Sequence, residues 1–348
     1  MIAETDPQKM YRAMQAKLAG VVPDFELKIK SEFAAEINRL KVERNAVILG
    51  HNYMEPALFH SIPDFVGDSL ELARRAAQTD KDVIVFCGVK FMAETAKILN
   101  PTKTVLLPSE KAGCSLAESI TAEDVRELRR RFPGVPVVTY VNTYADVKAE
   151  SDICCTSGNA VAVVESLKTG TVIFIPDEYL ARNIAKQTGK RIIFPTSDPR
   201  KKFEDDLDYQ MIGWPGRCEV HDKFTVEDIV AVRKQFPDVT ILAHPECSPE
   251  VVAASDFSGS TTAMIRHVEN TSSARYLLLT ECSMGDNVAA ANPDKEMLRL
   301  CSVRCPHMNQ ITLEDTLESL RKNQYVIEIP QEILKRAARS VERMIAIG

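Results

Sequence analysis

The chain has 348 residues, of which 45% are hydrophobic and 26% charged, and its formal net charge is −6. This composition is typical of a globular protein, and the acidic balance argues against general nucleic-acid binding. No apolar run reaches the length of a membrane span and the N-terminus lacks a basic-then-apolar signal, so we expect a cytoplasmic protein with no membrane partner. Nine cysteines in a reducing compartment indicate metal binding or catalysis before disulfides.

Predicted strands and helices alternate along the chain, and this order indicates parallel sheets with helices on both faces. The predicted strands cover residues 46–50, 83–87, 104–107, 135–141, 171–175, 191–194, 239–243, 276–279 and, more weakly, 326–329. Predicted helices include residues 23–43, 92–99, 180–187 and 331–347. We expect the first and last of these helices to pack on the first domain.

Three cysteines share one local pattern, because each is followed at the same distance by Thr-x-Glu-Asp, a typical helix start. They are Cys114, Cys218 and Cys305. Such fixed offsets are rare among unrelated α/β elements. The pattern predicts an α/β fold of three homologous αβα domains, with parallel sheets arranged about a pseudo-threefold axis and one thiol per copy. We place the domains at residues 1–118, 119–222 and 223–348, with the C-terminal helix packing back on the first.

A second repeated signal lies where strands end in polar residues and small hydroxyl residues begin the next helix. The strand ends are His51-Asn52-Tyr53, Tyr140-Val141-Asn142 and His244-Pro245-Glu246, and the helix starts contain Ser69, Ser157 and Ser260-Thr261. The spacing from helix start to cysteine is 45 residues in the first and third copies and 61 in the second. The extra residues of the middle copy would lie in the loop-like stretch 196–213.

Three thiolates around one point form a metal site with one open coordination position. Zinc with a bound water and a [4Fe–4S] cluster with one iron lacking a protein ligand are the two common occupants, and spacing does not separate them. Either metal would act as a Lewis acid toward a carboxylate or hydroxyl. The alternative is three equivalent buried thiols without a metal.

The three hydroxyl-bearing helix starts suit phosphate or carboxylate groups, although each could equally serve as a plain N-cap. Together they predict a substrate with several anionic groups. His51 and His244 occupy matching strand ends beside Tyr53 and Glu246, and Glu246 is a candidate general base. Tyr140 and Asn142 supply the polar groups of the middle copy. The other four histidines, at positions 60, 221, 267 and 307, are predicted to lie at the surface or behind the residues that touch a ligand.

The remaining cysteines are predicted to have structural places. Cys87 ends an apolar strand and belongs in the core, and Cys154 and Cys155 are expected to pack. Cys247 is expected to line the site without binding metal. Cys282 and Cys301 are rivals to Cys305, but only Cys305 has Thr-x-Glu-Asp at the right distance. Oxidation of Cys301 and Cys305 to a disulfide would remove a ligand.

Taken together, these motifs resemble the quinolinate synthase family of de novo NAD biosynthesis. The segments that carry the resemblance are His51-Asn52-Tyr53, residues 67–73 and 88–99, Gly113-Cys114-Ser115-Leu116, Tyr140-Val141-Asn142, Thr156-Ser157, Trp214-Pro215-Gly216-Arg217-Cys218, Val220-His221, His244-Pro245-Glu246, Gly259-Ser260-Thr261 and Cys305-Pro306. They follow the family order from about residue 45 to residue 320. The loop 280–285 is only loosely similar, which leaves any role of Glu281 open.

The resemblance implies a triangle of three related domains and a [4Fe–4S] cluster held by Cys114, Cys218 and Cys305, with the fourth iron open. It implies that iminoaspartate condenses with dihydroxyacetone phosphate to quinolinate, with loss of phosphate and two waters. An aspartate oxidase or dehydrogenase would supply the imine. By the family pattern the substrate contacts are His51, Ser69, Tyr140, Asn142, Ser157, His244, Glu246 and Thr261. Proton transfer falls to Tyr53 and Glu246, with His51 and His244 beside them.

Two other functions stay open at this point. One is a zinc lyase or hydrolase with a three-cysteine site acting on a multiply anionic small substrate. The other is an iron–sulfur sensor, which would normally carry a nucleic-acid or partner-binding module, and the sequence shows no basic helix or appended domain of that kind.

Overall fold

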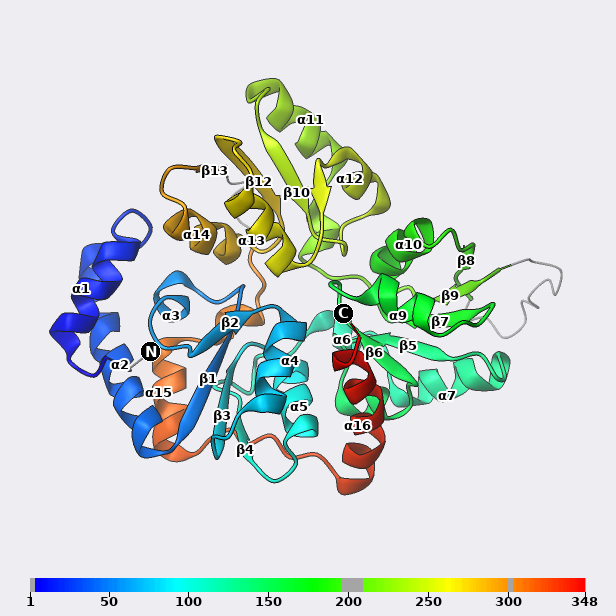
Figure 1. The fold of residues 1–348 in the computed structure, drawn as a ribbon, viewed down its shortest axis with the longest axis horizontal. Helices are drawn as coiled ribbons and strands as arrows, with labels where there is room; N and C mark the ends of the chain where they lie inside the picture. The colour runs from blue at the N-terminus through cyan, green and yellow to red at the C-terminus, as the bar shows by residue number, and fades with distance from the viewer. Residues whose placement is uncertain (1–3, 196–208, 299–302, 348) are drawn as a thin grey trace.

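The computed structural model describes residues 4–195, 209–298 and 303–347, and it contains three parallel sheets. Their strand orders are β2-β1-β3-β4, β6-β5-β7-β9-β8 and β11-β10-β12-β13. In each sheet the first strand of the lobe therefore lies between the second and the third. Every pairing within the sheets is parallel. Each sheet with its helices forms one lobe, and the three lobes surround a common centre (Figure 1). This confirms the predicted fold class of three αβα units.

The lobes contain equivalent elements in the same order. The first lobe consists of β1 (Ala46–His51), α3 (Pro56–Phe59), β2 (Phe65–Gly67), α4 (Ser69–Gln78), β3 (Val83–Cys87), α5 (Lys90–Leu99) and β4 (Thr104–Leu106). The middle lobe consists of α7 (Ala122–Arg131), β5 (Val137–Tyr140), α8 (Ala145–Ala149), β6 (Ile153–Cys155), α9 (Ala160–Ser166), β7 (Val172–Ile175), α10 (Glu178–Gln187), β8 (Ile192–Ile193) and β9 (Met211–Gly213). The third lobe consists of α11 (Val226–Gln235), β10 (Thr240–Ala243), α12 (Pro249–Ala254), β11 (Phe257–Ser258), α13 (Thr261–Asn270), β12 (Arg275–Leu279), α14 (Cys282–Ala291) and β13 (Glu296–Leu298).

Local chemistry explains where these elements form. The central strands of the first two lobes are short, mostly apolar runs buried along their whole length, as expected of parallel strands covered on both faces. The helices that follow the repeated cysteines begin at Thr121, Thr225 and Thr312, whose side chains each accept a hydrogen bond from the backbone N–H three residues on. Asp124 and Asp228 reciprocate and complete capping boxes.

A further feature repeated in all three lobes is an aspartate that binds the backbone of the first strand. In every lobe an aspartate carboxylate accepts the backbone N–H of the first strand and pairs with a basic residue of the preceding helix. The carboxylates and their basic partners are Asp64 with Lys41, Asp152 with Arg129, and Asp256 with Arg233. The basic partners take equivalent places in the three lobes, so the lobes repeat in detail.

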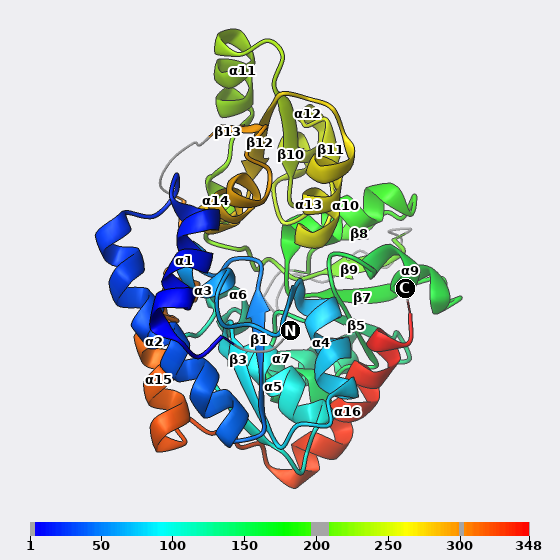
Figure 2. The same ribbon diagram turned by 60° about the vertical axis from the view of Figure 1, so that its left-hand side comes forward.

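The terminal helices tie the lobes together. They are α1 (Pro7–Leu18), α2 (Asp24–Glu43), α15 (Leu313–Lys322) and α16 (Gln331–Ile345). As expected, α2 packs on the first lobe, where it contacts β1 and α15. The C-terminal helix α16 lies between two lobes and contacts α8 and β6 as well as α5 (Figure 2).

One strand prediction and one loop prediction were wrong. Residues 326–329 form no strand, and Val326 makes only an isolated antiparallel bridge to Leu106 at the edge of the first sheet. The stretch 196–213 was expected to be a loop, but β9 (Met211–Gly213) inserts into the middle sheet beside β7 and leaves β8 at the edge. The strand predicted at 191–194 is therefore an additional edge strand. Residues 196–208 lie outside the described part of the chain.

Burial is extensive, and the largest hydrophobic cluster joins the first lobe to the face of the middle sheet under α16. The third lobe has separate clusters on the two faces of its sheet.

Within the described ranges no helix is both long and apolar enough to span a bilayer. The domain boundaries at 118/119 and 222/223 stay a prediction.

Candidate active site at the junction of the lobes

One cavity lies where the carboxyl ends of the three sheets meet. Its empty volume is about 700 Å³, including the part that is open to solvent. All the predicted site residues border it: His51, Tyr53, Ser69, Cys114, Tyr140, Asn142, Ser157, Cys218, His244, Glu246, Thr261 and Cys305. Strand ends and helix starts converge there because ligands of parallel sheets collect at the carboxyl ends of strands. The structure thus brings these residues together, and their individual roles stay predictions.

The three repeated cysteines each stand just before a short helical turn. Cys114 precedes α6 (Ser115–Glu118), Cys218 precedes η1 (His221–Lys223) and Cys305 precedes η2 (Met308–Gln310). The backbone N–H of Met308 donates to the Cys305 sulfur at 3.5 Å, and in each case backbone N–H groups two and three residues further on lower the pKa of the thiol. Such N–H groups stabilise a thiolate over a thiol.

Burial opposes ionisation of the same sulfurs. It raises the pKa of the Cys114 thiol to about 12 and that of Cys305 to about 11, and it also raises the pKa of Cys218. With pKa values raised in this way, the three thiols stay protonated at neutral pH unless a cation accompanies them. A metal centre supplies that positive charge, because coordination deprotonates a thiol outright.

His51 and His244 occupy equivalent positions and share one geometry. The Nδ1 of His51 accepts the backbone N–H of Tyr53 at 3.2 Å, and the Nδ1 of His244 accepts that of Glu246 at 3.3 Å. Burial lowers the pKa of His51 to about 4 and of His244 to about 3, so both rings are neutral at pH 7. Their Nε2 atoms then carry the proton, and that of His244 faces the Ser157 hydroxyl at 3.2 Å.

Glu246 is the centre of the polar network. One carboxylate oxygen accepts the Tyr140 hydroxyl and, at 3.5 Å, the side-chain amide of Asn142, while the other lies 2.8 Å from Nδ1 of His221. Burial raises the pKa of Glu246, but the adjacent His221 and the Tyr140 hydroxyl more than offset this effect. The net shift lowers the pKa of Glu246, so the carboxylate is ionised at neutral pH.

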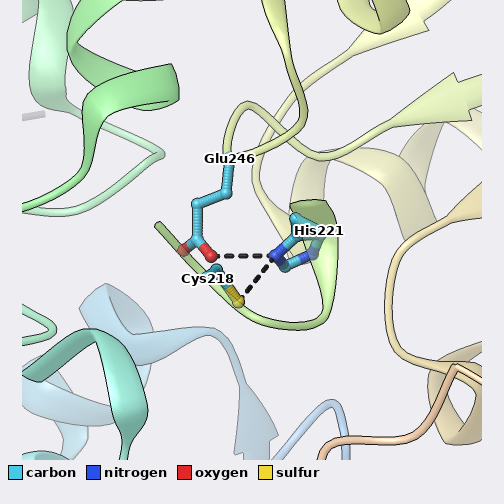
Figure 3. A group of neighbouring side chains, drawn as sticks. All are labelled: Cys218, His221 and Glu246. Carbon is cyan, nitrogen blue, oxygen red and sulfur yellow. Dashed lines mark hydrogen bonds and ion pairs between the residues drawn. The ribbon is translucent and has the colours of Figure 1, made fainter. Parts of the chain in front are cut away.

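Cys218, His221 and Glu246 form a compact group whose ligand atoms lie within 4.8 Å of one another (Figure 3). Thiolate, imidazole and carboxylate are also the ligands of many zinc sites. In this group, however, His221 Nδ1 contacts both the Glu246 oxygen at 2.8 Å and the Cys218 sulfur at 3.2 Å. These are hydrogen-bond distances, and the ring nitrogen fills the space between the other two groups.

The predicted anion-binding helix starts border the same cavity. Ser69 begins α4, Thr261 begins α13, and Ser157 stands two residues before the Asn159 that precedes α9. Among the described residues, the buried Oδ1 of Asn142 has no hydrogen-bond partner, although Asn142 lines the cavity. An unpaired buried acceptor is costly, so a ligand donor at this place would be stabilising.

Three residues in or beside the site escaped the sequence analysis. His221 was expected at the surface or behind the site, but it is buried, lines the cavity and contacts Glu246 directly. Thr280 joins His221 to Tyr53 through its hydroxyl. Lys148 is fully buried and its ammonium donates to the carbonyls of Val141 and Thr143, on either side of Asn142. The only available signal was the quoted Val220-His221 motif.

The other cysteines and histidines follow the predictions in part. Cys87, Cys154 and Cys155 are buried in the core as expected. Cys247 is buried too, but it does not line the cavity, because its thiol points to the Leu279 carbonyl. Cys282 borders a different, smaller cavity. Cys301, which was considered as a partner of Cys305 on oxidation, lies outside the described residues.

The remaining histidines divide by position. His307 lines the cavity and pairs with Glu219 at 3.2 Å. His267 lies away from it and stacks on Phe257, and His60 packs edge-on against Phe59. Glu281, whose role was left open, caps α14 by accepting the backbone N–H of Ser283.

Comparison with known proteins gives a consistent result. The chain matches the family described as Quinolinate synthetase A protein over residues 35–346. It is 56% identical over 318 residues to Quinolinate synthase 2 of Mesorhizobium japonicum, covering 90% of this chain and 92% of the relative. Quinolinate synthase 1 of the same organism is 53% identical over 95% of this chain and 96% of its own length. Quinolinate synthase of Xylella fastidiosa is 54% identical over 89% of this chain and 86% of its own length.

The matched region contains all three lobes and every residue that borders the cavity. Identity above one half over nine tenths of both chains leaves no alternative family. The chain belongs to the quinolinate synthase A family of enzymes.

Proposed function

We propose that this enzyme condenses iminoaspartate with dihydroxyacetone phosphate and releases quinolinate, phosphate and two waters. Family membership supports the reaction class. The observation that carries the finer proposal is the shared cavity, because the three cysteines and nine polar residues expected for this chemistry all border it.

The donor set fits a [4Fe–4S] cluster held by Cys114, Cys218 and Cys305. The three sulfurs come from equivalent places in the threefold repeat, share one cavity, and each faces two backbone N–H groups. Hydrogen bonds to sulfur are among the features by which proteins tune such clusters. When bound, the cluster would supply a Lewis-acidic iron with one open coordination position.

The chain's own residues account for binding. Iminoaspartate brings two carboxylates and the triose brings a phosphate, so each helix start, at Ser69, Ser157 and Thr261, has a candidate anionic partner. The neutral His51 and His244 can each donate one hydrogen bond from Nε2 without adding a charge. Asn142 offers its unpaired Oδ1 to a substrate hydroxyl or amine.

Two residues are assigned to proton transfer. Glu246 is ionised and buried, so it can remove a proton from the condensed carbon chain. Burial raises the pKa of Tyr53, so its hydroxyl keeps a proton that it can give to a departing oxygen. Tyr140 and Asn142 hold the Glu246 carboxylate in place.

The test is a reaction with anaerobically purified protein, oxaloacetate, ammonia and dihydroxyacetone phosphate. We expect quinolinate and free phosphate to appear in equal amounts. Replacing the triose phosphate by dihydroxyacetone should abolish product, because the phosphate is both anchor and leaving group. A preparation that contains the cofactor but consumes neither substrate contradicts the proposal. An imine-forming aspartate oxidase or dehydrogenase should replace oxaloacetate and ammonia in the same assay.

Zinc held by Cys114, Cys218 and Cys305 is the alternative occupant of the site, because thiolates are also zinc ligands. Metal and sulfide content separate the two candidates.

A further inference from the structure

The backbone of each lobe is held in the same way where it reaches the cavity. In every lobe, the carbonyls one and three residues after the equivalent positions His51, Tyr140 and His244 accept hydrogen bonds from a single buried nitrogen. The carbonyl pairs and their donors are Asn52 and Met54 with the Asn287 side-chain amide at 3.2 and 2.8 Å, Pro245 and Cys247 with the Asn183 side-chain amide at 2.8 and 3.0 Å, and Val141 and Thr143 with the Lys148 ammonium. The three donors are at most 3% exposed, so water does not compete with them.

One residue lies between the two carbonyls of each pair, and its side chain borders the cavity. These residues are Tyr53, Asn142 and Glu246. Because the peptide unit is planar, fixing the carbonyls before and after a residue restricts backbone rotation on both sides of it. In the first and third lobes, ring nitrogens of His51 and His244 also accept the N–H of the same residue. The direction in which the side chain leaves the backbone is thereby set.

Two of the three donors come from a neighbouring lobe. Asn287 lies on α14 of the third lobe and reaches the first lobe, and Asn183 lies on α10 of the middle lobe and reaches the third. Each stands six residues after the N-cap of its helix, which is Glu281 or Asp177. The two helices pack on α3 and α12, the helices that follow the first strand of the lobe that they reach. The two contacts between lobes are therefore equivalent.

The third contact of this ring uses a different side chain. Helix α5 of the first lobe packs on α8 of the middle lobe, but the residue six positions after its N-cap is Thr95, whose hydroxyl donates to the Phe91 carbonyl of its own helix. Lys148 of α8 supplies the bridging donor instead, and its ammonium lies 5.6 Å from the centre of the Phe91 ring. The two carbonyls of the middle lobe are thus bridged although the asparagine is absent.

Burying these donors has a cost that only their hydrogen bonds offset. Within the described ranges, Oδ1 of Asn287 has no hydrogen-bond partner, and Lys148 is a charged group fully removed from water. An apolar residue would avoid both penalties. None of the three donors borders the cavity, so they hold the backbone and do not contact a ligand there.

We propose that Asn183, Asn287 and Lys148 are positioning residues, each of which fixes the direction of the cavity-lining side chain between the carbonyls that it bridges. The inference rests on the proposed function, in which Glu246 and Tyr53 transfer protons. Since both asparagines reach across from a neighbouring lobe, the docking of the lobes sets the geometry of the proton-transfer pair. A misplacement of about 1 Å in such a group lowers the rate by about 10²-fold.

The experiment is a double-mutant cycle on the cofactor-containing enzyme with oxaloacetate, ammonia and dihydroxyacetone phosphate. Asn183→Ala removes both hydrogen bonds and should lower turnover by about 10-fold to about 10²-fold at unchanged iron content. The same change made in Glu246→Gln should lower turnover further by less than about 2-fold, because Asn183 acts through Glu246. Asn183→Leu, which fills the space, serves if the alanine variant folds poorly.

Asn100→Ala is the matched control. Asn100 is also buried, and its side-chain amide also donates to two carbonyls, those of Ala76 and Ala96, but it does not hold a loop of the cavity. This variant should lower the midpoint of thermal unfolding about as much as Asn183→Ala and leave turnover unchanged. An equal loss of turnover in Asn100→Ala would overturn the proposal, because lowered stability would then explain both variants.

Two further cycles test the other donors independently. Asn287→Ala is combined with Tyr53→Phe, and Lys148→Met with Asn142→Ala, and the same lack of a further loss is expected in each. Losses that multiply within a cycle, or undiminished turnover in its single donor variant, overturn the role of that donor. A wild-type enzyme that forms no quinolinate overturns the proposed function itself, so the two failures are distinguishable.

Discussion

At the scale of single residues, Glu246 decides how the site works. Its carboxylate receives hydrogen bonds from Tyr140 and Asn142 of the middle lobe and from His221, so two separate segments fix one side chain. The strand-end position and the neighbouring Pro245 predicted that Glu246 would face the site. The contact with His221 could not be predicted, because nothing in the sequence relates position 221 to position 246.

Glu246→Gln tests the base role. The amide keeps the shape and can still accept hydrogen bonds from Tyr140, but it cannot take a proton. We expect turnover to fall by about 10² to 10⁴-fold while the cofactor content stays unchanged. Quinolinate formation and iron content measured on the same anaerobic sample separate the two effects, and undiminished activity would remove Glu246 from this role.

The buried histidines make stability depend on pH. Burial lowers the pKa of His51 to about 4, whereas an unfolded histidine titrates near 6.5. Below about pH 6.5 the unfolded chain therefore takes up a proton that the folded chain refuses until about pH 4, so stability falls as the pH drops through this window. The slope is at most about 1.4 kcal/mol per pH unit for this residue.

Denaturant unfolding of wild type and His51→Gln between pH 7.5 and 5 measures this contribution. The variant should show the flatter dependence of unfolding free energy on pH, because it lacks one proton uptake in the unfolded state. Identical slopes would mean that His51 takes up its proton over the same pH range in the folded and the unfolded protein.

At the scale of elements, the repeated Thr-x-Glu-Asp motif predicted three helix starts because a capping box is a local interaction between near neighbours. The strand pattern was equally local and predicted most of the parallel strands. It failed at β9 (Met211–Gly213), because a strand of three residues is too short to show a pattern, although β7 and β8 pair with it on either side. It failed again at Val326, which forms only an isolated bridge to Leu106 at the edge of the first sheet.

Thr225→Ala tests the energetic weight of one repeated cap. The Thr225 hydroxyl accepts the Asp228 N–H, and Asp228 accepts the Thr225 N–H in return. Loss of the hydroxyl should destabilise the third lobe by about 1 kcal/mol, seen as a lower midpoint of thermal unfolding. Thr225→Ser should stay within a few tenths of a kcal/mol of wild type. A larger loss in the serine variant would show that the threonine methyl, and not the cap, is the stabilising group.

At the scale of the whole molecule, the repeat of cysteines, strand ends and helix starts predicted that three lobes surround one site, and the shared cavity confirms that these residues meet. The contacts that cross between lobes were beyond sequence reasoning. Tyr53 and Thr280 are 227 positions apart, and Thr280 has no repeated motif around it. Such pairs follow from how the lobes close on one another, which a single sequence does not specify.

Substitution of the cysteines one at a time tests the threefold site. We expect Cys114→Ser, Cys218→Ser and Cys305→Ser each to abolish both cofactor and activity, since a centre held by three thiolates loses a third of its protein ligands. Cys87→Ser is the matched control, because Cys87 is fully buried in the core and does not line the cavity. It should keep the visible absorbance of the cofactor, although it will lower stability somewhat. Retention of the cofactor in Cys305→Ser would show that another residue is the third ligand.

The central claim is that three lobes each donate one sulfur to a single iron centre, and the metal and sulfide content of anaerobically purified protein tests it most directly. The account predicts a brown protein with about four iron and about four sulfide per chain and no stoichiometric zinc. A colourless protein with one zinc per chain and no sulfide would contradict it.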